Sequence, residues 1–286
     1  PVLAQEDLTV GFAIAKSGWM EAYDTPAATA AMIRIEEINA AGGLLGRQIK
    51  VVEADTRTDR AESAKAGLDV LDQGAEMMVV SCDYDFGAPA ALVAEGEGMN
   101  SFFLCAEDVK AGIQGVGPNS FSSSVLGPVQ GATMAEWAHA KREARTAYVL
   151  EDTFIEYNKG LCTGFNWMFP QLDGAQIVGS DTFKNDDASI ASQITRIKEL
   201  PEQPDVIMLC SFMPGAAAAV RQLRHLDREA ERGGGGHGLE AEAGAGAGRP
   251  ARAGGGGDRV SRDRSGARPR RQGGRDDGAH PVRPVQ

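Results

Sequence analysis

The sequence is poor in basic residues and has no long apolar run. Among its 286 residues, 29 are Lys or Arg and 40 are Asp or Glu, which gives a net charge of −11. Nucleic-acid phosphates are bound by basic surfaces, so this deficit disfavours DNA or RNA as a partner. No apolar run reaches the roughly 18 residues of a membrane-spanning helix, which excludes such a helix in the chain as given.

Motifs for metals, nucleotides and redox chemistry are also missing. The 4 cysteines form no C-x-x-C pair, which excludes zinc ribbons and thioredoxin-type sites. The glycine-rich stretch at 42–46 follows an expected helix and precedes an expected strand, the reverse of a dinucleotide-binding loop. Asp83 and Asp85 lack the glycine-rich surroundings of a calcium loop. We therefore predict no cofactor and no metal site.

Short β-rich runs alternate with amphipathic helical runs as far as Leu226. This alternation predicts βαβ units and parallel sheets in an α/β fold. An irregular stretch at 105–127 divides it into two series, so we predict two Rossmann-like lobes, residues 5–121 and an incomplete second lobe at 122–226. The expected strands are 8–14, 49–53, 77–81, 102–104, 147–150, 176–183 and 205–209; the expected helices are 25–41, 60–73, one after Pro89, 129–140, 158–168, 189–200 and 215–226.

The composition changes abruptly at residue 227. Residues 227–286 contain 12 basic and 9 acidic residues, two Gly-Gly-Gly-Gly runs and only four large aliphatic residues. Such a segment buries too little apolar surface to offset its backbone entropy, so we predict a disordered tail. Its Gly, Ala, Arg and Pro content also resembles GC-rich DNA translated out of frame, which suggests a frameshift near 226–232. Translating the gene in its other two frames tests this: neither frame resuming the alternation would contradict it.

The first residues resemble the end of a secretory signal. Val2 and Ala4 occupy the −3 and −1 positions that signal peptidase prefers for cleavage before Gln5. We therefore expect a chain that is exported across the inner membrane to the periplasm.

Aromatic and acidic residues follow several of the expected strands. Ligands of open parallel sheets lie beyond the carboxyl ends of the strands, so these turns are the candidate site. Aromatic walls with a few polar anchors suit an amphipathic small molecule, and carboxylates suit an ammonium group. The alternative is that the acids only cap helices. The candidate residues are Trp19, Tyr23, Asp83, Tyr84, Asp85, Ala106, Glu107, Asp108, Tyr157 and Phe212.

Cys82 lies at a strand-to-helix turn, where nucleophiles are often found. A Cys82-dependent amidase would need a histidine base, but His139 and His225 fall on expected helices in or next to the second lobe. Cys82 and Cys105 follow two strands that are neighbours in one possible arrangement, so a disulfide between them is an alternative in an oxidising compartment.

Several stretches resemble the type I periplasmic solute-binding proteins of ABC importers, in the branched-chain amino-acid group. Residues 35–49 are similar to the family's EEINAAGG-x-x-GR signature, and Leu8-Thr9-Val10-Gly11 resembles its first strand. Ser17-Gly18 followed by Tyr23 resembles its first loop, and Glu151-Asp152 with Tyr157 resembles the loop that opens the second lobe. The resemblance extends from about Asp7 to Leu226.

The resemblance implies two lobes that close on a small solute and present it to an ABC permease, without covalent chemistry. It implies ligand contacts at Tyr23, near Tyr84, at 106–108, at Tyr157 and near Phe212. It also implies a periplasmic protein, and we expect a monomer. A ligand-sensing receptor domain of the same fold is the alternative function.

Two departures from the family pattern alter these expectations. Relatives offer hydroxyl groups and backbone N–H groups to the solute carboxylate, whereas this chain has acidic residues after its third and fourth expected strands. We therefore expect a more positively charged solute, such as an amide or a basic amino-acid derivative. Family members also continue beyond the point where the resemblance ends, so we expect weak binding, or none, from the chain as written.

Overall fold

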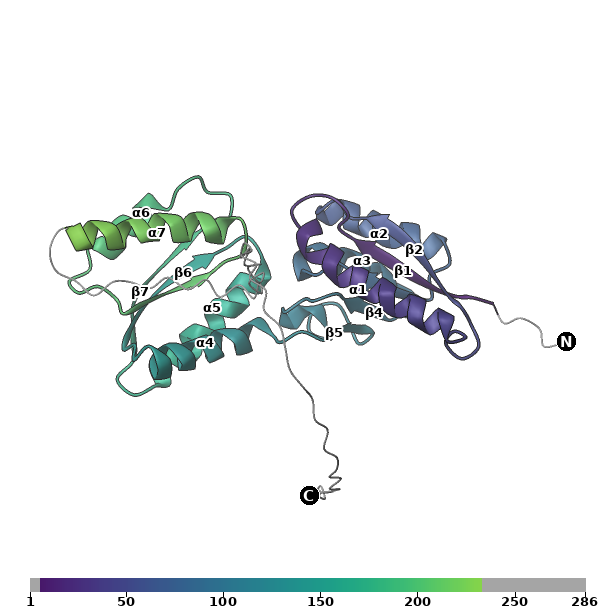
Figure 1. Cartoon of the computed structure of the whole chain (residues 1–286), viewed down its shortest axis with the longest axis horizontal. Helices are drawn as coiled ribbons and strands as arrows, with labels where there is room; N and C mark the ends of the chain where they lie inside the picture. The colour runs from purple at the N-terminus through teal and green to yellow at the C-terminus, as the bar shows by residue number, and fades with distance from the viewer. Residues whose placement is uncertain (1–5, 233–286) are drawn as a thin grey trace, which may run out of the picture. The chain divides into compact units, whose positions relative to one another are not determined.

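The structure, a computed structural model, describes residues 6–232, with side chains to Arg224. The predicted signal remnant at 1–5 and the predicted tail from 233 onward lie outside the described residues. Strands and helices alternate along the chain, as predicted (Figure 1). They form two separate parallel sheets, one with strand order β2-β1-β3-β4-β5 and one with order β7-β6-β8.

The first sheet consists of β1 (Leu8–Ile14), β2 (Ile49–Asp55), β3 (Met77–Val80), β4 (Ser101–Phe103) and β5 (Ser120–Ser122). Helices α2 (Arg60–Asp72) and α3 (Tyr84–Gly96) pack on one face, and α1 (Glu21–Ala40) packs on the other. The alternating direction of strand side chains explains this division, because Met78 and Val80 join the α2–α3 core while Met77 and Val79 join the α1 core.

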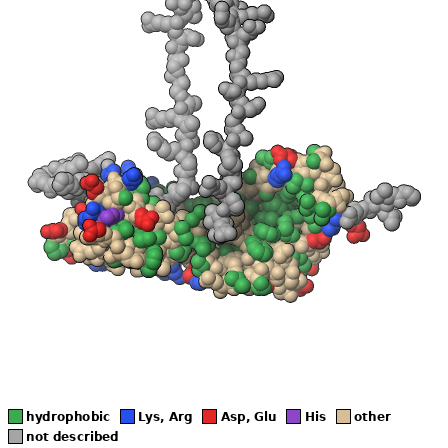
Figure 2. All heavy atoms as spheres, turned by 90° about the horizontal axis from the view of Figure 1, so that it is seen from below, with side chains coloured by type: hydrophobic (Ala, Val, Ile, Leu, Met, Phe, Trp, Pro, Cys, Tyr) green, Lys and Arg blue, Asp and Glu red, His purple; other side chains and the backbone are tan. Residues whose placement is uncertain are grey.

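Coverage of the α1 face decreases toward β5. Val79, Phe102 and Phe121 are paired in register across β3, β4 and β5. The Phe102 and Phe121 rings stack with centroids 5.2 Å apart, yet these side chains are 39 % and 44 % exposed. Figure 2 shows one face of the described chain, on which hydrophobic side chains gather between smaller groups of charged ones.

The second sheet consists of β6 (Thr146–Asp152), β7 (Gln176–Phe183) and β8 (Val206–Cys210). Helices α4 (Gly127–Lys141) and α5 (Glu156–Met168) cover one face, and α6 (Ala191–Lys198) and α7 (Gly215–Arg232) cover the other. Glycine allows α4 and α5 to approach closely, because a Cβ atom at Gly164 would collide with the Pro128 carbonyl oxygen. Cys162 of α5 forms a disulfide with Cys210 of β8, with Cα atoms 5.6 Å apart.

Several predicted boundaries differ from the structure. Helices α1 and α3 begin at Glu21 and Tyr84, whereas the sequence predicted starts at residue 25 and after Pro89. Proline favours the first turn of a helix, but in α1 and α3 the prolines, Pro26 and Pro89, lie beyond the first turn. The three-residue strand β5 was missed inside the irregular stretch, and the predicted lobe boundary at 121/122 falls within it.

Helix α7 also continues to Arg232, six residues beyond the predicted end at Leu226. Residues 227–232 read Asp-Arg-Glu-Ala-Glu-Arg, and most of these types favour helix before the glycine run begins. The change in composition therefore does not coincide with the end of regular structure. Over the described residues, no helix is long and apolar enough to cross a membrane.

Candidate functional site

Aromatic side chains from turns of both sheets meet around Trp19. The Trp19 ring lies after β1, and its centroid is 5.4 Å from that of Phe86, at the start of α3. It is also 4.8 Å from Phe212, which follows β8, and 6.2 Å from Phe154, which follows β6. Tyr23 completes this aromatic cluster, with its ring centroid 6.2 Å from that of Trp19. Turns far apart in the sequence thus form one apolar surface at the carboxyl ends of the strands.

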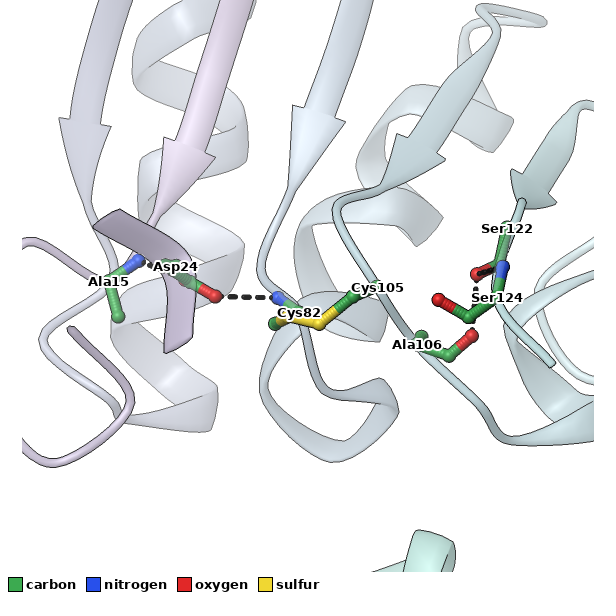
Figure 3. Close-up of a disulfide and its surroundings, with 7 residues drawn as sticks. All are labelled: Ala15, Asp24, Cys82, Cys105, Ala106, Ser122 and Ser124. Carbon is green, nitrogen blue, oxygen red and sulfur yellow. Dashed lines mark hydrogen bonds between the residues drawn. A yellow bond between two sulfur atoms is a disulfide. The ribbon is translucent and has the colours of Figure 1, made fainter. Parts of the chain in front are cut away.

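A disulfide lies among the aromatic side chains. Cys82 after β3 is bonded to Cys105 after β4, with Cα atoms 4.5 Å apart (Figure 3), and both residues pack in the same buried cluster as Trp19 and Phe212. The alternative of a Cys82-dependent amidase is wrong in this structure, because the Cys82 sulfur is bonded and is not a free nucleophile.

Asp24 joins the ends of two adjacent strands beside this disulfide. Its carboxylate is fully buried and accepts the backbone N–H of Ala15 and that of Cys82, each at 2.7 Å (Figure 3). Burial raises its pKa, and the two backbone hydrogen bonds partly offset that effect. The sequence analysis missed Asp24 because it placed the residue just before the helix rather than in its first turn.

Asp83 is a buried carboxylate at the start of α3. Only 7 % of the residue is exposed, and its Oδ1 atom has no hydrogen-bond partner within the described part of the chain. Burial, followed by the nearby charge of Asp85, raises the pKa of Asp83 to about 8. This carboxyl group therefore holds a proton at neutral pH unless a positive charge is placed beside it.

Asp85 is occupied by two partners. One of its oxygens accepts from the Arg60 guanidinium at 2.6 Å, and the other accepts from the backbone N–H of Glu156 at 2.8 Å. Glu156 is the first residue of α5, so Asp85 caps a helix of the second sheet from the first. The structure therefore favours the helix-capping alternative for this residue.

Glu107 and Tyr157 lie together, and Tyr157 packs against the aromatic cluster. The Tyr157 hydroxyl donates to the Gln130 side-chain oxygen at 3.2 Å. Burial raises the pKa of Glu107, and the neighbouring Gln130 and Tyr157 side chains partly offset the rise. Burial and then the Glu107 charge raise the pKa of Tyr157. This pair offers a half-buried carboxyl and a hydroxyl.

The remaining predicted residues have mainly local roles. Asp108 accepts the Lys110 N–H at 2.6 Å and caps the short 3₁₀ helix η1 (Val109–Ala111). Lys110 pairs with Glu156 at 2.6 Å and lies 6.0 Å above the Tyr84 ring. Tyr84 packs against the first core rather than in the aromatic cluster. Ala106 is buried, and its carbonyl oxygen accepts the hydroxyl of Ser122 (Figure 3).

The second sheet has its own buried carboxylate, which the sequence analysis also missed. Asp152, at the end of β6, is fully buried and accepts the Phe154 N–H at 3.1 Å. The Ser211 hydroxyl and the Asn185 amide each donate to it at 2.7 Å, so one carboxylate joins the turns after all three strands of this sheet. Within the described part of the chain, no group of three or more His, Cys, Asp and Glu side chains is arranged to hold a metal ion.

This fold, with its turns gathered at the carboxyl ends of two parallel sheets, defines a binding protein of the α/β class. Comparison with known sequences specifies the family: the chain belongs to the periplasmic binding proteins, whose family model matches residues 7–254. The family resemblance noted in the sequence is therefore confirmed, but its predicted end at Leu226 is wrong, because the match continues to residue 254.

Individual relatives are distant in sequence. A Leu/Ile/Val-binding protein, BraC3 of Rhizobium johnstonii, is 25 % identical over 231 residues, which cover 80 % of this chain and 61 % of that protein. The chain thus spans about 61 % of the length of this curated relative.

Solved structures confirm the predicted two-lobed α/β fold. The substrate-binding protein LivJ of Streptococcus pneumoniae, solved with isoleucine, has a TM-score of 0.68 and 25 % identity, covering 77 % of this chain and 61 % of that one. The leucine-binding protein LivK of Thermotoga maritima has a TM-score of 0.66 and 23 % identity, covering 77 % and 60 %. A solute-binding protein of Rhodopseudomonas palustris solved with 3,4-dihydroxybenzoic acid has a TM-score of 0.58 and 18 % identity, covering 79 % and 59 %.

Proposed function

We propose that this chain is the extracytoplasmic solute-binding component of an ABC importer and captures an amino-acid-like amide. The observation that carries this proposal is the contact of Trp19 with Phe212 at 4.8 Å, which joins turns of the two sheets in one aromatic cluster. Such a surface at the carboxyl ends of parallel strands is where ligands of this fold class bind. Closure on the solute would then present a changed shape to the permease.

The carboxyl groups beside the aromatic cluster favour a solute with a positive or hydrogen-bond-donating end. Asp83 is buried with an unpartnered oxygen, and Glu107 is half-buried beside Tyr157. The nearest cations are already paired, Arg60 with Asp85 and Lys110 with Glu156. An ammonium or amide N–H satisfies these oxygens, whereas a carboxylate offers them no hydrogen-bond donor. This supports an amide or a basic derivative over a simple amino acid.

The two disulfides support an oxidising compartment. Cys82–Cys105 and Cys162–Cys210 account for all 4 cysteines of the chain. Structural disulfides persist outside the cytosol and are rare inside it. A periplasmic location therefore suits both the covalent structure and the family.

The test compares two solutes of nearly equal shape by the shift that each causes in melting temperature. L-leucinamide retains the ammonium group of L-leucine and replaces its carboxylate with a neutral amide. We expect leucinamide to raise the melting temperature more than leucine, at high solute concentration because binding is expected to be weak.

The matched variants replace one tryptophan each. Trp19→Ala should abolish the shift, while Trp167→Ala, on the exposed side of α5 with 63 % exposure, should retain it. If no amino acid or amide in a broader panel shifts the wild-type melting temperature, the proposed function is wrong.

A further inference from the structure

The Asp24 carboxylate accepts hydrogen bonds from two backbone N–H groups. Without Asp24, these two groups would be free to bind an anionic group of a ligand. The N–H groups of Ala15 and Cys82 follow β1 and β3, which are adjacent parallel strands. Backbone N–H groups in such turns bind carboxylates and phosphates in many α/β proteins. Here each N–H donates to a different oxygen of the fully buried Asp24 side chain.

Further carboxyl groups lie near Asp24, and the nearest basic side chains are paired with other acids, Arg60 with Asp85 and Lys110 with Glu156. Asp83 follows Cys82 directly and leaves one oxygen unpartnered. Asp108 and Glu107 lie after the next strand, and Lys110 there is paired with Glu156. The carboxyl edge of the first sheet thus carries several carboxyl groups, and the amides of Ala15 and Cys82 are in use.

We propose that Asp24 is a positioning residue that sets solute specificity: it holds the turns after β1 and β3 and takes the amides that would bind a solute carboxylate. The inference rests on the proposed function and specifies the class of solute. The site should reject free carboxylates and accept the corresponding amides, because the protein supplies its own anion at this place.

The second sheet provides the matched control. Asp152 is equally buried, but two of its three donors are side chains, the Ser211 hydroxyl and the Asn185 amide. Replacing Asp152 with Asn should lower stability without altering the preference between amide and carboxylate. If Asp24 has a purely structural role, Asp24→Asn should likewise lower stability without altering the preference between amide and carboxylate.

The experiment measures the dissociation constants of L-leucinamide and L-leucine by calorimetry for the wild type, Asp24→Asn and Asp152→Asn. We expect the preference for leucinamide to fall by about tenfold in Asp24→Asn, on the scale of one charge-assisted hydrogen bond, and to persist in Asp152→Asn. An unchanged preference in Asp24→Asn would overturn the inference while leaving the proposed function intact. Failure of every amino acid and amide in the broader panel to bind the wild type would instead remove the proposed function.

Formate provides a second readout that survives poor folding of the Asn variant. Asp24→Ala frees both amides, so sodium formate should raise the melting temperature of this variant above that seen with sodium chloride, or restore its folding. The wild type, in which Asp24 occupies both amides, should show no such formate effect. Absence of a formate-specific effect on Asp24→Ala would contradict the assignment.

Discussion

The buried carboxyl group of Asp83 should make the stability of this protein depend on pH near neutrality. The pKa of Asp83 is raised to about 8 in the folded chain, mainly by burial, against an ordinary value of 3.8. The folded state therefore holds a proton that the unfolded state releases between these two values. Stability is greatest below the unfolded pKa and is lost as the pH rises through the folded pKa.

The size of this effect follows from the same two pKa values. Proton linkage at this single group gives a loss of about 4 kcal/mol in unfolding free energy between pH 5 and pH 9. Burial also raises the pKa values of Asp24, Glu107 and Asp108, and these groups act in the same direction.

Urea denaturation at a series of pH values measures this loss of unfolding free energy. In the Asp83→Asn variant the loss should disappear, because the amide does not titrate. The amide resembles the protonated acid, so the variant should match the wild type only below the unfolded pKa, exceed it by about 1–2 kcal/mol at pH 5 and exceed it by several kcal/mol more at pH 9. The urea dependence of the unfolding free energy should stay constant, since the surface exposed on unfolding does not change. Parallel curves for wild type and variant from pH 5 to pH 9 would refute the reasoning.

Three further expectations concern packing, covalent linkage and charge. Gly164→Ala should lower the unfolding free energy by about 1–3 kcal/mol because its methyl group meets a backbone carbonyl, whereas Gly96→Ala, with open space around the added carbon, should be neutral or stabilising in the same urea assay. Cys162→Ser removes the disulfide to Cys210, which links residues 48 positions apart, and should lower the unfolding free energy by about 4 kcal/mol. A loss of less than about 1 kcal/mol would argue against this disulfide. Lys110→Ala breaks a partly exposed pair with Glu156 and should cost less than about 1 kcal/mol, as judged by thermal unfolding in low and high salt.

The order of strands and helices could be predicted from the sequence because the spacing of apolar residues shows which face of each element is buried. Strand β7 was predicted at its observed limits, and β1 likewise. The starts of α1 and α3 were misplaced because proline position is a local preference, and contacts formed only in the fold, such as those of Asp24, override it. Strand β5 is three residues long and carries no periodic signal.

The candidate site was only partly accessible, since spacing places residues at the ends of strands but does not show which side chains meet. Trp19 and Phe212 were chosen as strand-end aromatics, and the structure brings them into contact. Asp85 was chosen on the same basis, yet it caps α5. Asp24 and Asp152 were missed because their partners are backbone amides and turns distant in the sequence.

The stacked Phe102 and Phe121 rings bear on how this protein behaves in a test tube. They lie on the last two strands of a sheet whose terminal strand is only three residues long, and both remain substantially exposed to water. Uncovered aromatic surface on an edge strand of the described sheet promotes adhesion between molecules. Dilute samples and mild detergent should therefore preserve material that concentrated samples lose to precipitation.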